Sequence, residues 1–118
     1  MKNFLLILAA LFSSQVFAQV TIGSVPIEEI DADYLEIVGQ AKMLKLMEVN
    51  IYVDYGQVGG IKDIKEGHIK DASGKRIAFN GMMGAVNFFV DYGYKLDFAY
   101  PLSTGNGMVY HYILKKDR

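Results

Sequence analysis

Hydrophobic and polar residues alternate along two neighbouring stretches of the chain, and this alternation predicts two half-buried strands. In the first stretch, residues 33–42, Leu35 and Ile37 share one side and polar residues occupy the other. The second stretch, residues 46–56, is more regular. Its apolar side is formed by Met47, Val49, Ile51, Val53 and Tyr55. A period of two with one apolar side is typical of a strand with one buried face, and the short connection at 41–44 favours a hairpin.

The pattern changes to a helical repeat between Asn80 and Gly93. Four polar positions recur at spacings of three and four and fall on one stripe, within ~60° of one another on a helix; they are Asn80, Gly84, Asn87 and Asp91. The opposite side carries Met82, Ala85, Val86 and Phe89. Asparagine is a favourable N-cap residue and glycine commonly ends a helix. We therefore expect an amphipathic helix of about three turns.

Several shorter elements complete the pattern. We expect one helical turn near Pro26, a surface loop over 56–67, and two short strands around a turn at 71–74, where Gly74 supplies a positive φ. After the helix, residues 94–100 alternate again, and this alternation predicts a strand that Pro101 ends or places at a sheet edge. The residues expected on one side of it are Tyr94, Leu96, Phe98 and Tyr100. A turn at 103–107 leads to a last strand.

Together these elements predict the fold class. We expect an α+β domain of two layers, in which an antiparallel sheet of five or six strands carries one main helix on one face.

The first eighteen residues have the layout of a signal peptide. Lys2 precedes an apolar run over 4–12, and the small residues Val16 and Ala18 stand where a cleavage site requires them. The apolar run is much shorter than the ~20 residues of a membrane-spanning helix. We therefore expect a leader at 1–18, a single exported domain at 19–118 in the periplasm or outside the cell, and no integral membrane segment after cleavage. An uncleaved N-terminal anchor is the alternative.

Composition narrows the possible partners. The chain has 12 basic and 13 acidic residues, and losing Lys2 leaves 12 − 1 = 11 against 13, a net charge of −2. This near balance gives no electrostatic reason to expect nucleic acid as a partner. The sequence has no cysteine, so it has no disulfide and no zinc–cysteine site, and a domain of this size must be held by one hydrophobic core.

The C-terminal third also resembles a pattern found in small exported bacterial proteins of uncharacterised function. The residues that carry the resemblance are "DYGYKLDFAY", where a helix stops at Gly93 and a strand starts at Tyr94, and "VYHYILKK", a last strand with basic residues at its end. The loose motif covers 82–116, with tyrosine at 94 where the broader pattern has tryptophan. The resemblance implies the fold and the export, and no activity.

Catalytic motifs are incomplete in this sequence. A hydrolase needs a nucleophile, a base and a group that orients the base, and the chain has only two histidines, His68 and His111. His111 lies in the last predicted strand, and Asp97 or Ser103 would have to lie beside it. No serine stands in a Gly-x-Ser-x-Gly elbow. A small acid/base hydrolase that uses His111 with Asp97 is therefore the alternative to a non-catalytic role.

No cofactor or metal site is predicted. The acidic group Glu28, Glu29, Asp31 and Asp33 is interpreted as a solvated lead-in. The segment from Asp71 lacks the glutamate and glycine of a calcium loop. "GQVGG" lacks the end of a P-loop, and the methionines are interpreted as core residues rather than copper ligands.

Aromatic residues exceed what one small core needs. Eight tyrosines and four phenylalanines follow the leader, and tyrosine-rich surfaces with few charges are typical of recognition sites. The positions that we expect on such a surface are Met83, Phe88, Tyr110 and Tyr112. We therefore expect a non-catalytic exported domain that binds a protein partner or small ligand in the cell envelope through an aromatic sheet face. A homo-oligomer is also possible, and a sheet face covered by the chain's own lead-in or loop is the alternative.

Overall fold

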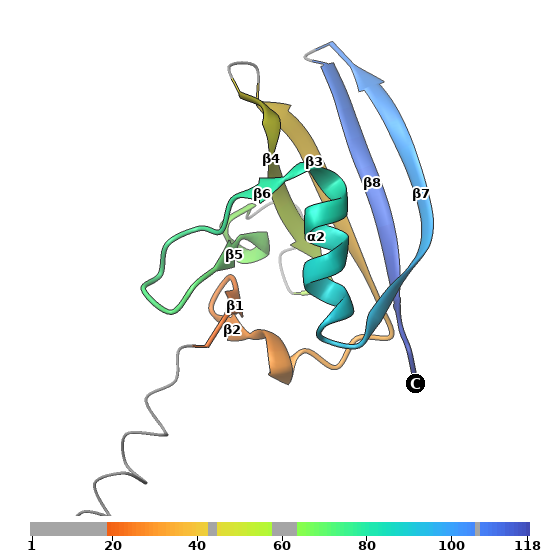
Figure 1. The fold of residues 1–118 in the computed structure, drawn as a ribbon. Helices are drawn as coiled ribbons and strands as arrows, with labels where there is room; N and C mark the ends of the chain where they lie inside the picture. The colour runs from red at the N-terminus through yellow and green to blue at the C-terminus, as the bar shows by residue number, and fades with distance from the viewer. Residues whose placement is uncertain (1–18, 43–44, 58–63, 106) are drawn as a thin grey trace, which may run out of the picture.

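The protein is described by a computed structural model over residues 19–42, 45–57, 64–105 and 107–118, so the predicted leader at 1–18 lies outside the described residues. The main sheet has five strands in the order β6-β4-β3-β8-β7, and all neighbours are antiparallel. These strands are β3 (Tyr34–Lys42), β4 (Lys45–Asp54), β6 (Phe79–Asn80), β7 (Tyr94–Thr104) and β8 (Gly107–Lys116). Helix α2 (Gly81–Val90) lies on one face of this sheet (Figure 1).

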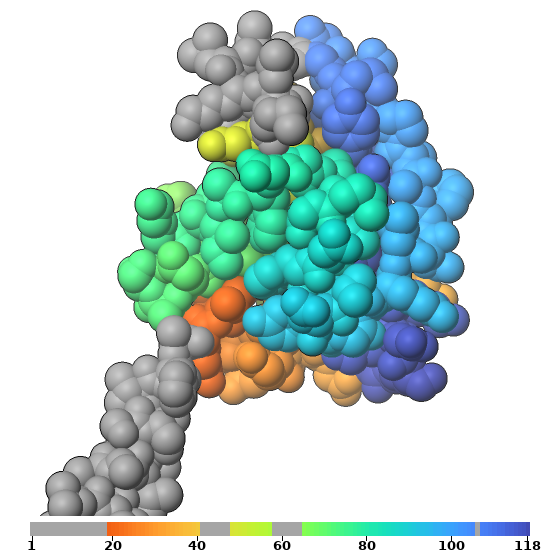
Figure 2. All heavy atoms as spheres, viewed as in Figure 1, coloured from red at the N-terminus to blue at the C-terminus, as the bar shows by residue number. Residues whose placement is uncertain are grey.

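A smaller sheet closes the same side of the molecule. It has the order β2-β1-β5, and its strands are β1 (Thr21–Ile22), β2 (Val25–Pro26) and β5 (Ile69–Lys70). Two 3₁₀ helices, η2 (Ile27–Glu29) and η4 (Ile64–Gly67), complete the described elements. Figure 2 shows the helix and the segments before it covering one face of the main sheet, with β7 visible beside them. The predicted α+β class with two layers is confirmed.

The core lies between the main sheet and the helix. The alternating residues predicted to face inward are buried, among them Leu35 and Ile37 on β3 and Val53 on β4. The helix buries Met82, Ala85, Val86 and Phe89, the four positions that its sequence pattern predicts. The turn near Pro26 is also confirmed as η2, and it buries Ile27. Apolar periodicity therefore identifies these buried side chains correctly.

The helix begins at the predicted residue, whereas its last residue is Val90 and its C-cap is Asp91, two positions before the predicted cap Gly93. Asn80 occupies the N-cap position, although its side chain makes no capping hydrogen bond. Gly93 has a φ of +89°, and its amide donates to the carbonyl of Val90. This left-handed conformation favours glycine and turns the chain directly into β7.

The chain pairs with itself across the predicted turn at residues 71–74. Gly74 has the predicted positive φ, +83°, and the turn is held by Asp71 Oδ1, which accepts hydrogen bonds from Ser73 and from the amide of Lys75. Lys70 forms an antiparallel bridge with Arg76, and the Ile77 amide donates to the carbonyl of Ile69 at 2.8 Å. The two sides then join different sheets, since β5 also pairs with β1 and β6 pairs with β4, where Phe79 is buried opposite Val49.

The predicted side-chain arrangement of β7 is wrong in its second half. Leu96 lies opposite Leu114, which is fully buried, but Phe98 lies opposite Ile113. A β-bulge at Asp97 inserts one extra residue between them. Because side chains alternate along a strand, one extra residue turns everything that follows toward the other face. Phe98 therefore lies on the face away from the helix, whereas Tyr94 is buried in the core.

The two edge strands of the main sheet differ in how their outward backbone groups are bonded. Beyond its short pairing with β6, the edge of β4 is completed by side chains: Arg76 Nη2 donates to the carbonyl of Ile51 at 2.9 Å, and Gln57 Nε2 donates to that of Val53 at 2.8 Å. Strand β7 forms the other edge. The prediction that Pro101 marks a sheet edge is confirmed.

Among the described residues, no helix combines the length and the apolar character needed to cross a membrane.

Candidate functional site

The face of the main sheet opposite helix α2, called the outer face below, carries two rows of side chains. The strand registers align the residues of each row across β4, β3, β8 and β7. The first row is Tyr52, Val38, His111 and Tyr100, and the second is Asp54, Glu36, Ile113 and Phe98. These positions alternate with the inward-facing residues of the core, so their side chains lie on the outer face.

A polar cluster of three side chains occupies the middle of this face. His111 Nδ1 lies 2.7 Å from Glu36 Oε1, and the Tyr100 hydroxyl donates to the same oxygen at 3.4 Å. The rings of Tyr100 and His111 are stacked, with centroids 4.8 Å apart and planes 3° from parallel. Each member touches the other two, so the cluster holds the imidazole in a fixed orientation.

The surroundings of Tyr100 favour its neutral form. Desolvation by neighbouring groups raises the pKa of Tyr100 above its ordinary value, and the negative charge and hydrogen bond of Glu36 raise it further. A neutral phenol can donate a hydrogen bond, and the Tyr100 hydroxyl donates to Glu36. The cluster therefore presents a flat aromatic surface whose polar groups are directed at Glu36.

The structure gives His111 a different carboxylate from the one expected. Glu36 on β3 is its partner, whereas Asp97 lies exposed in the bulge of β7. The residue opposite His111 on β7 is Tyr100. Ser103 lies opposite Met108, three positions further along β7 than Tyr100. The register therefore brings neither Asp97 nor Ser103 to the position directly opposite the imidazole.

Exposed apolar side chains surround the polar cluster. Phe98 is 58% exposed, and Leu102 and Tyr34 are each 50% exposed. Since a fully exposed large side chain presents roughly 200 Å², these three alone expose about 300 Å². Patches of this size on a small protein are often functional. We call the surface formed by Tyr34, Phe98, Tyr100, Leu102 and Ile113 the aromatic patch.

The four residues predicted to form an interaction surface have different surroundings. Tyr110 and Tyr112 are partly buried and pack against the core on the helix side of the sheet. Phe88 also packs against the core, with its ring 5.5 Å from that of Phe79. Met83 is 53% exposed on the helix. The more exposed aromatic surface is therefore the outer face, and the sequence pattern missed Phe98 because of the bulge.

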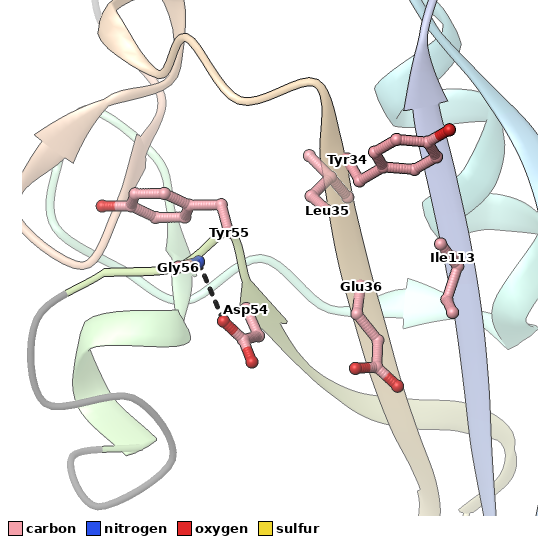
Figure 3. A pocket seen from close by; sticks show the side chains of 7 residues that line it. All are labelled: Tyr34, Leu35, Glu36, Asp54, Tyr55, Gly56 and Ile113. Carbon is pink, nitrogen blue, oxygen red and sulfur yellow. Dashed lines mark hydrogen bonds between the residues drawn. The ribbon is translucent and has the colours of Figure 1, made fainter.

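A pocket of about 350 Å³ opens beside the aromatic patch, where β3 begins and β4 ends. It is lined by Tyr34, Leu35, Glu36, Asp54, Tyr55, Gly56 and Ile113. Glu36 and Asp54 lie directly opposite each other on neighbouring strands. In Figure 3 their carboxylates lie below the rings of Tyr34 and Tyr55. The pocket thus combines two carboxylates with tyrosine and apolar lining residues.

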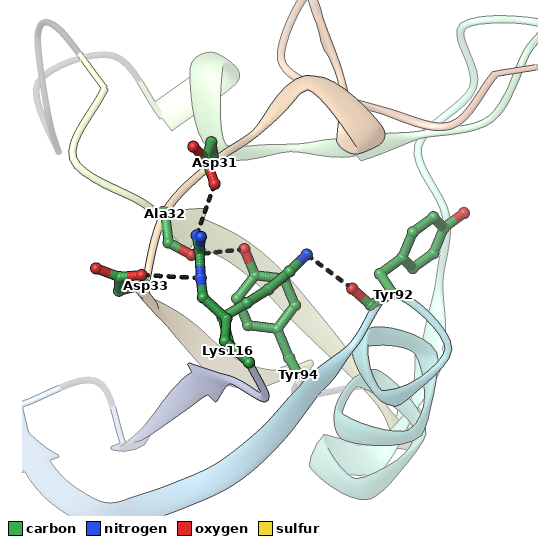
Figure 4. A network of polar contacts seen from close by, with 7 residues as sticks. Asp31, Ala32, Asp33, Tyr92, Tyr94 and Lys116 are labelled. Atoms are coloured by element: carbon green, nitrogen blue, oxygen red, sulfur yellow. Dashed lines mark hydrogen bonds and ion pairs between the residues drawn. The ribbon is translucent and has the colours of Figure 1, made fainter.

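The acidic lead-in is engaged by the C-terminus (Figure 4). Arg118 Nη2 lies 2.6 Å from Asp31 Oδ1, and its Nε lies 3.0 Å from Asp33 Oδ1. Over the residues that the structure describes, no group of three or more histidines or carboxylates is arranged to hold a metal ion.

No family model, no curated protein and no solved structure matches this chain.

Proposed function

We propose that this protein is an exported, non-catalytic binding domain whose aromatic patch on the outer face takes up a protein partner. The sequence pattern at 1–18, which predicts a leader, supports export to the periplasm or beyond. The observation that carries the binding role is the exposure of Phe98, Leu102 and Tyr34 on one face, opposite the face that the helix covers. Aromatic side chains are enriched at the centres of protein interfaces.

The orientation of the β7 backbone favours binding through the face rather than the edge. The Lys116 amide donates to Asp33, on the β3 side of β8. The backbone N–H and C=O groups of alternate residues point to opposite sides of a strand. The backbone groups of His111 therefore point toward β7, and those of its partner Tyr100 point back toward β8.

The β7 residues that alternate with Tyr100 direct their backbone groups to the free edge of the sheet. They are Ala99, Pro101 and Ser103, and Pro101 has no amide hydrogen to offer. A proline in the middle of an edge, together with a bulge, is how natural sheets prevent the addition of another strand. The partner is therefore expected on the face of the sheet.

Site-specific photo-crosslinking tests the proposal. A photoreactive phenylalanine analogue placed at Phe98 is expected to trap a discrete protein adduct in the cell envelope, because this position lies at the centre of the aromatic patch. The same analogue at Met83 is the matched control, since Met83 is similarly exposed but lies on the helix side. Equal adducts from both positions, or none from Phe98, would contradict the proposal.

The hydrogen bond between His111 and Glu36 supports a second candidate, a small acid/base hydrolase in which Glu36 takes the orienting role first expected of Asp97. If any hydrolytic turnover is found in the purified protein, His111→Ala should abolish it and leave the fold intact by circular dichroism. Turnover that survives His111→Ala removes this candidate, because His111 is the base that it requires.

A further inference from the structure

The pocket beside the aromatic patch has charged groups with bonding capacity left over. Glu36 uses Oε1 for both His111 and Tyr100, and Asp54 uses Oδ1 for the amide of Gly56. Within the described part of the chain, no hydrogen bond or ion pair engages the second oxygen of either carboxylate. Two acceptor oxygens therefore remain available at the pocket.

The two carboxylates are also placed unfavourably with respect to each other. Like charges directly opposite on neighbouring antiparallel strands destabilise a sheet. Their combined field is felt nearby: after desolvation, the charges of Glu36 and Asp54 are the causes that raise the pKa of Tyr52. Among the described cationic side chains, Lys115 lies over the ring of Tyr34, 5.8 Å from its centroid, and forms no ion pair with either carboxylate. A cation entering the pocket would relieve this repulsion.

The walls of the pocket suit an alkyl chain that ends in a charge. Tyr34 lies on the outer face and supplies an aromatic ring, which attracts ammonium and guanidinium groups, and Ile113 supplies an apolar contact on the same face. Ile113 also belongs to the aromatic patch, so the pocket and the patch form one continuous surface. A lysine or arginine side chain, with an apolar stem and a charged end, matches this combination.

We infer that the segment taken up by the outer face is cationic, with a lysine or arginine side chain in the pocket between Glu36 and Asp54 and apolar side chains on Phe98 and Leu102. This inference rests on the proposed binding role and adds the chemistry of the partner. Charge complementarity selects the occupant: the acidic pocket adjoins an apolar surface, and a basic amphipathic segment is complementary to both.

Titration with a defined peptide tests the inference. The probe is acetyl-Lys-Leu-Lys-Leu-Lys-amide, and its control is the same peptide with each lysine acetylated at Nε. Backbone amide shifts measured by NMR are expected to move at Tyr55 and Gly56 as well as at Phe98, and binding should weaken with added salt. The acetylated peptide is expected to bind roughly fivefold more weakly, the ratio that about 1 kcal/mol of lost ion pairing gives.

Two variants locate the effect. Asp54→Asn keeps the acceptor for the Gly56 amide but removes the negative charge. The variant should bind the lysine peptide roughly fivefold more weakly. Asp97→Asn removes one charge from the exposed bulge and should leave affinity unchanged. Equal losses in both variants would show general attraction to an acidic protein and overturn the inference.

The failure of each proposal is distinguishable in the same experiment. If both peptides bind equally and shift only Phe98 and its neighbours, the face binds partners but the cationic chemistry is wrong. If neither peptide shifts Phe98, the proposed binding role fails as well. Shifts at Phe98 that depend on protein concentration without peptide would assign the face to a second copy of the chain and overturn the cationic partner.

Discussion

At the scale of single residues, Gly39 sets how closely the helix approaches the sheet. A β-carbon built on Gly39 would overlap Met82 Sδ. Met82 projects from the first turn of α2 and is 7% exposed. The absence of a side chain at 39 therefore makes room for a core residue of the helix.

Gly39→Ala is expected to destabilise the protein by about 1 kcal/mol, because the flexible end of Met82 must move within a filled core to make room for the added methyl group. Urea denaturation measures this loss. Gly84→Ala is the matched control: it lies on the solvent side of α2, and the nearest atom to its new β-carbon is Phe79 Cβ at 3.9 Å. Since alanine is the better helix former, Gly84→Ala should stabilise the protein by about 0.5 to 1 kcal/mol. Equal losses at both positions would refute the packing argument.

At the scale of elements, the sequence predicts the helix and the inward sides of β3 and β4, because apolar periodicity reflects burial directly. Met82, Val86 and Phe89 were all placed correctly by this reasoning. The bulge at Asp97 could not be predicted, because an inserted residue leaves the alternation of residue types unchanged while it alters which face they occupy. Phe98 and Tyr100 were therefore assigned to the wrong side.

The free edge of β7 is the subject of a second prediction at this scale. Pro101→Val restores an amide donor at the middle of an exposed edge strand of eleven residues. The variant is expected to self-associate, because the restored donor completes a template for antiparallel pairing. Sedimentation velocity at increasing concentration measures this change.

Ala99→Val is the matched control for Pro101→Val. It adds the same side chain to the same edge but leaves the backbone amide donors of β7 unchanged. The variant should therefore keep the oligomeric state of the parent protein. If both variants self-associate, added hydrophobicity and not the backbone amide is the cause.

At the scale of the whole molecule, the C-terminus joins the lead-in to the end of the helix. The Lys116 amide donates to the carbonyl of Asp33, and its Nζ donates to that of Tyr92 at 3.0 Å. Lys116 Nζ also lies over the ring of Tyr94, and the Tyr94 hydroxyl donates to the carbonyl of Ala32 at 3.0 Å. Figure 4 shows these contacts gathered at one end of the sheet.

This end of the molecule makes stability sensitive to alkaline pH. Desolvation raises the pKa of Tyr94 above 10, an effect that Arg118 partly offsets and that Asp31 and Asp33 reinforce. The folded state thus binds its phenolic proton more tightly than the unfolded state does. The associated stability is complete below about pH 10 and is lost as pH rises through the higher folded pKa.

Tyr94→Phe should therefore reduce the loss of unfolding free energy between pH 9 and pH 11, measured by urea denaturation at each pH. The loss should not vanish, because Tyr52, Tyr55, Tyr92 and Tyr100 also have raised pKa values. An unchanged slope would show that Tyr94 titrates normally. At neutral pH the variant should lose about 0.5 to 1.5 kcal/mol with its hydrogen bond.

Strand order explains why the site was only partly predictable at this scale. The sequence identifies His111 as the histidine of interest and predicts that its side chain lies on the opposite face of the strand from those of Tyr110 and Tyr112. Its carboxylate partner, Glu36, lies 75 residues earlier in the chain. The two meet only because β8 is inserted between β3 and β7, and no local pattern records which strands become neighbours.

The bulge at Asp97 makes the outer face depend on strand register as well as on residue type. Deleting Asp97 would remove the bulge and leave Phe98 opposite Ile113 and Leu102 opposite Val109, so both would keep their places on the outer face. If Asp97 instead paired regularly with Ile113, Phe98 and Leu102 would turn toward the helix side and Ala99 and Pro101 would turn outward. The same side chains can therefore form two different surfaces, and the position of one unpaired residue decides between them.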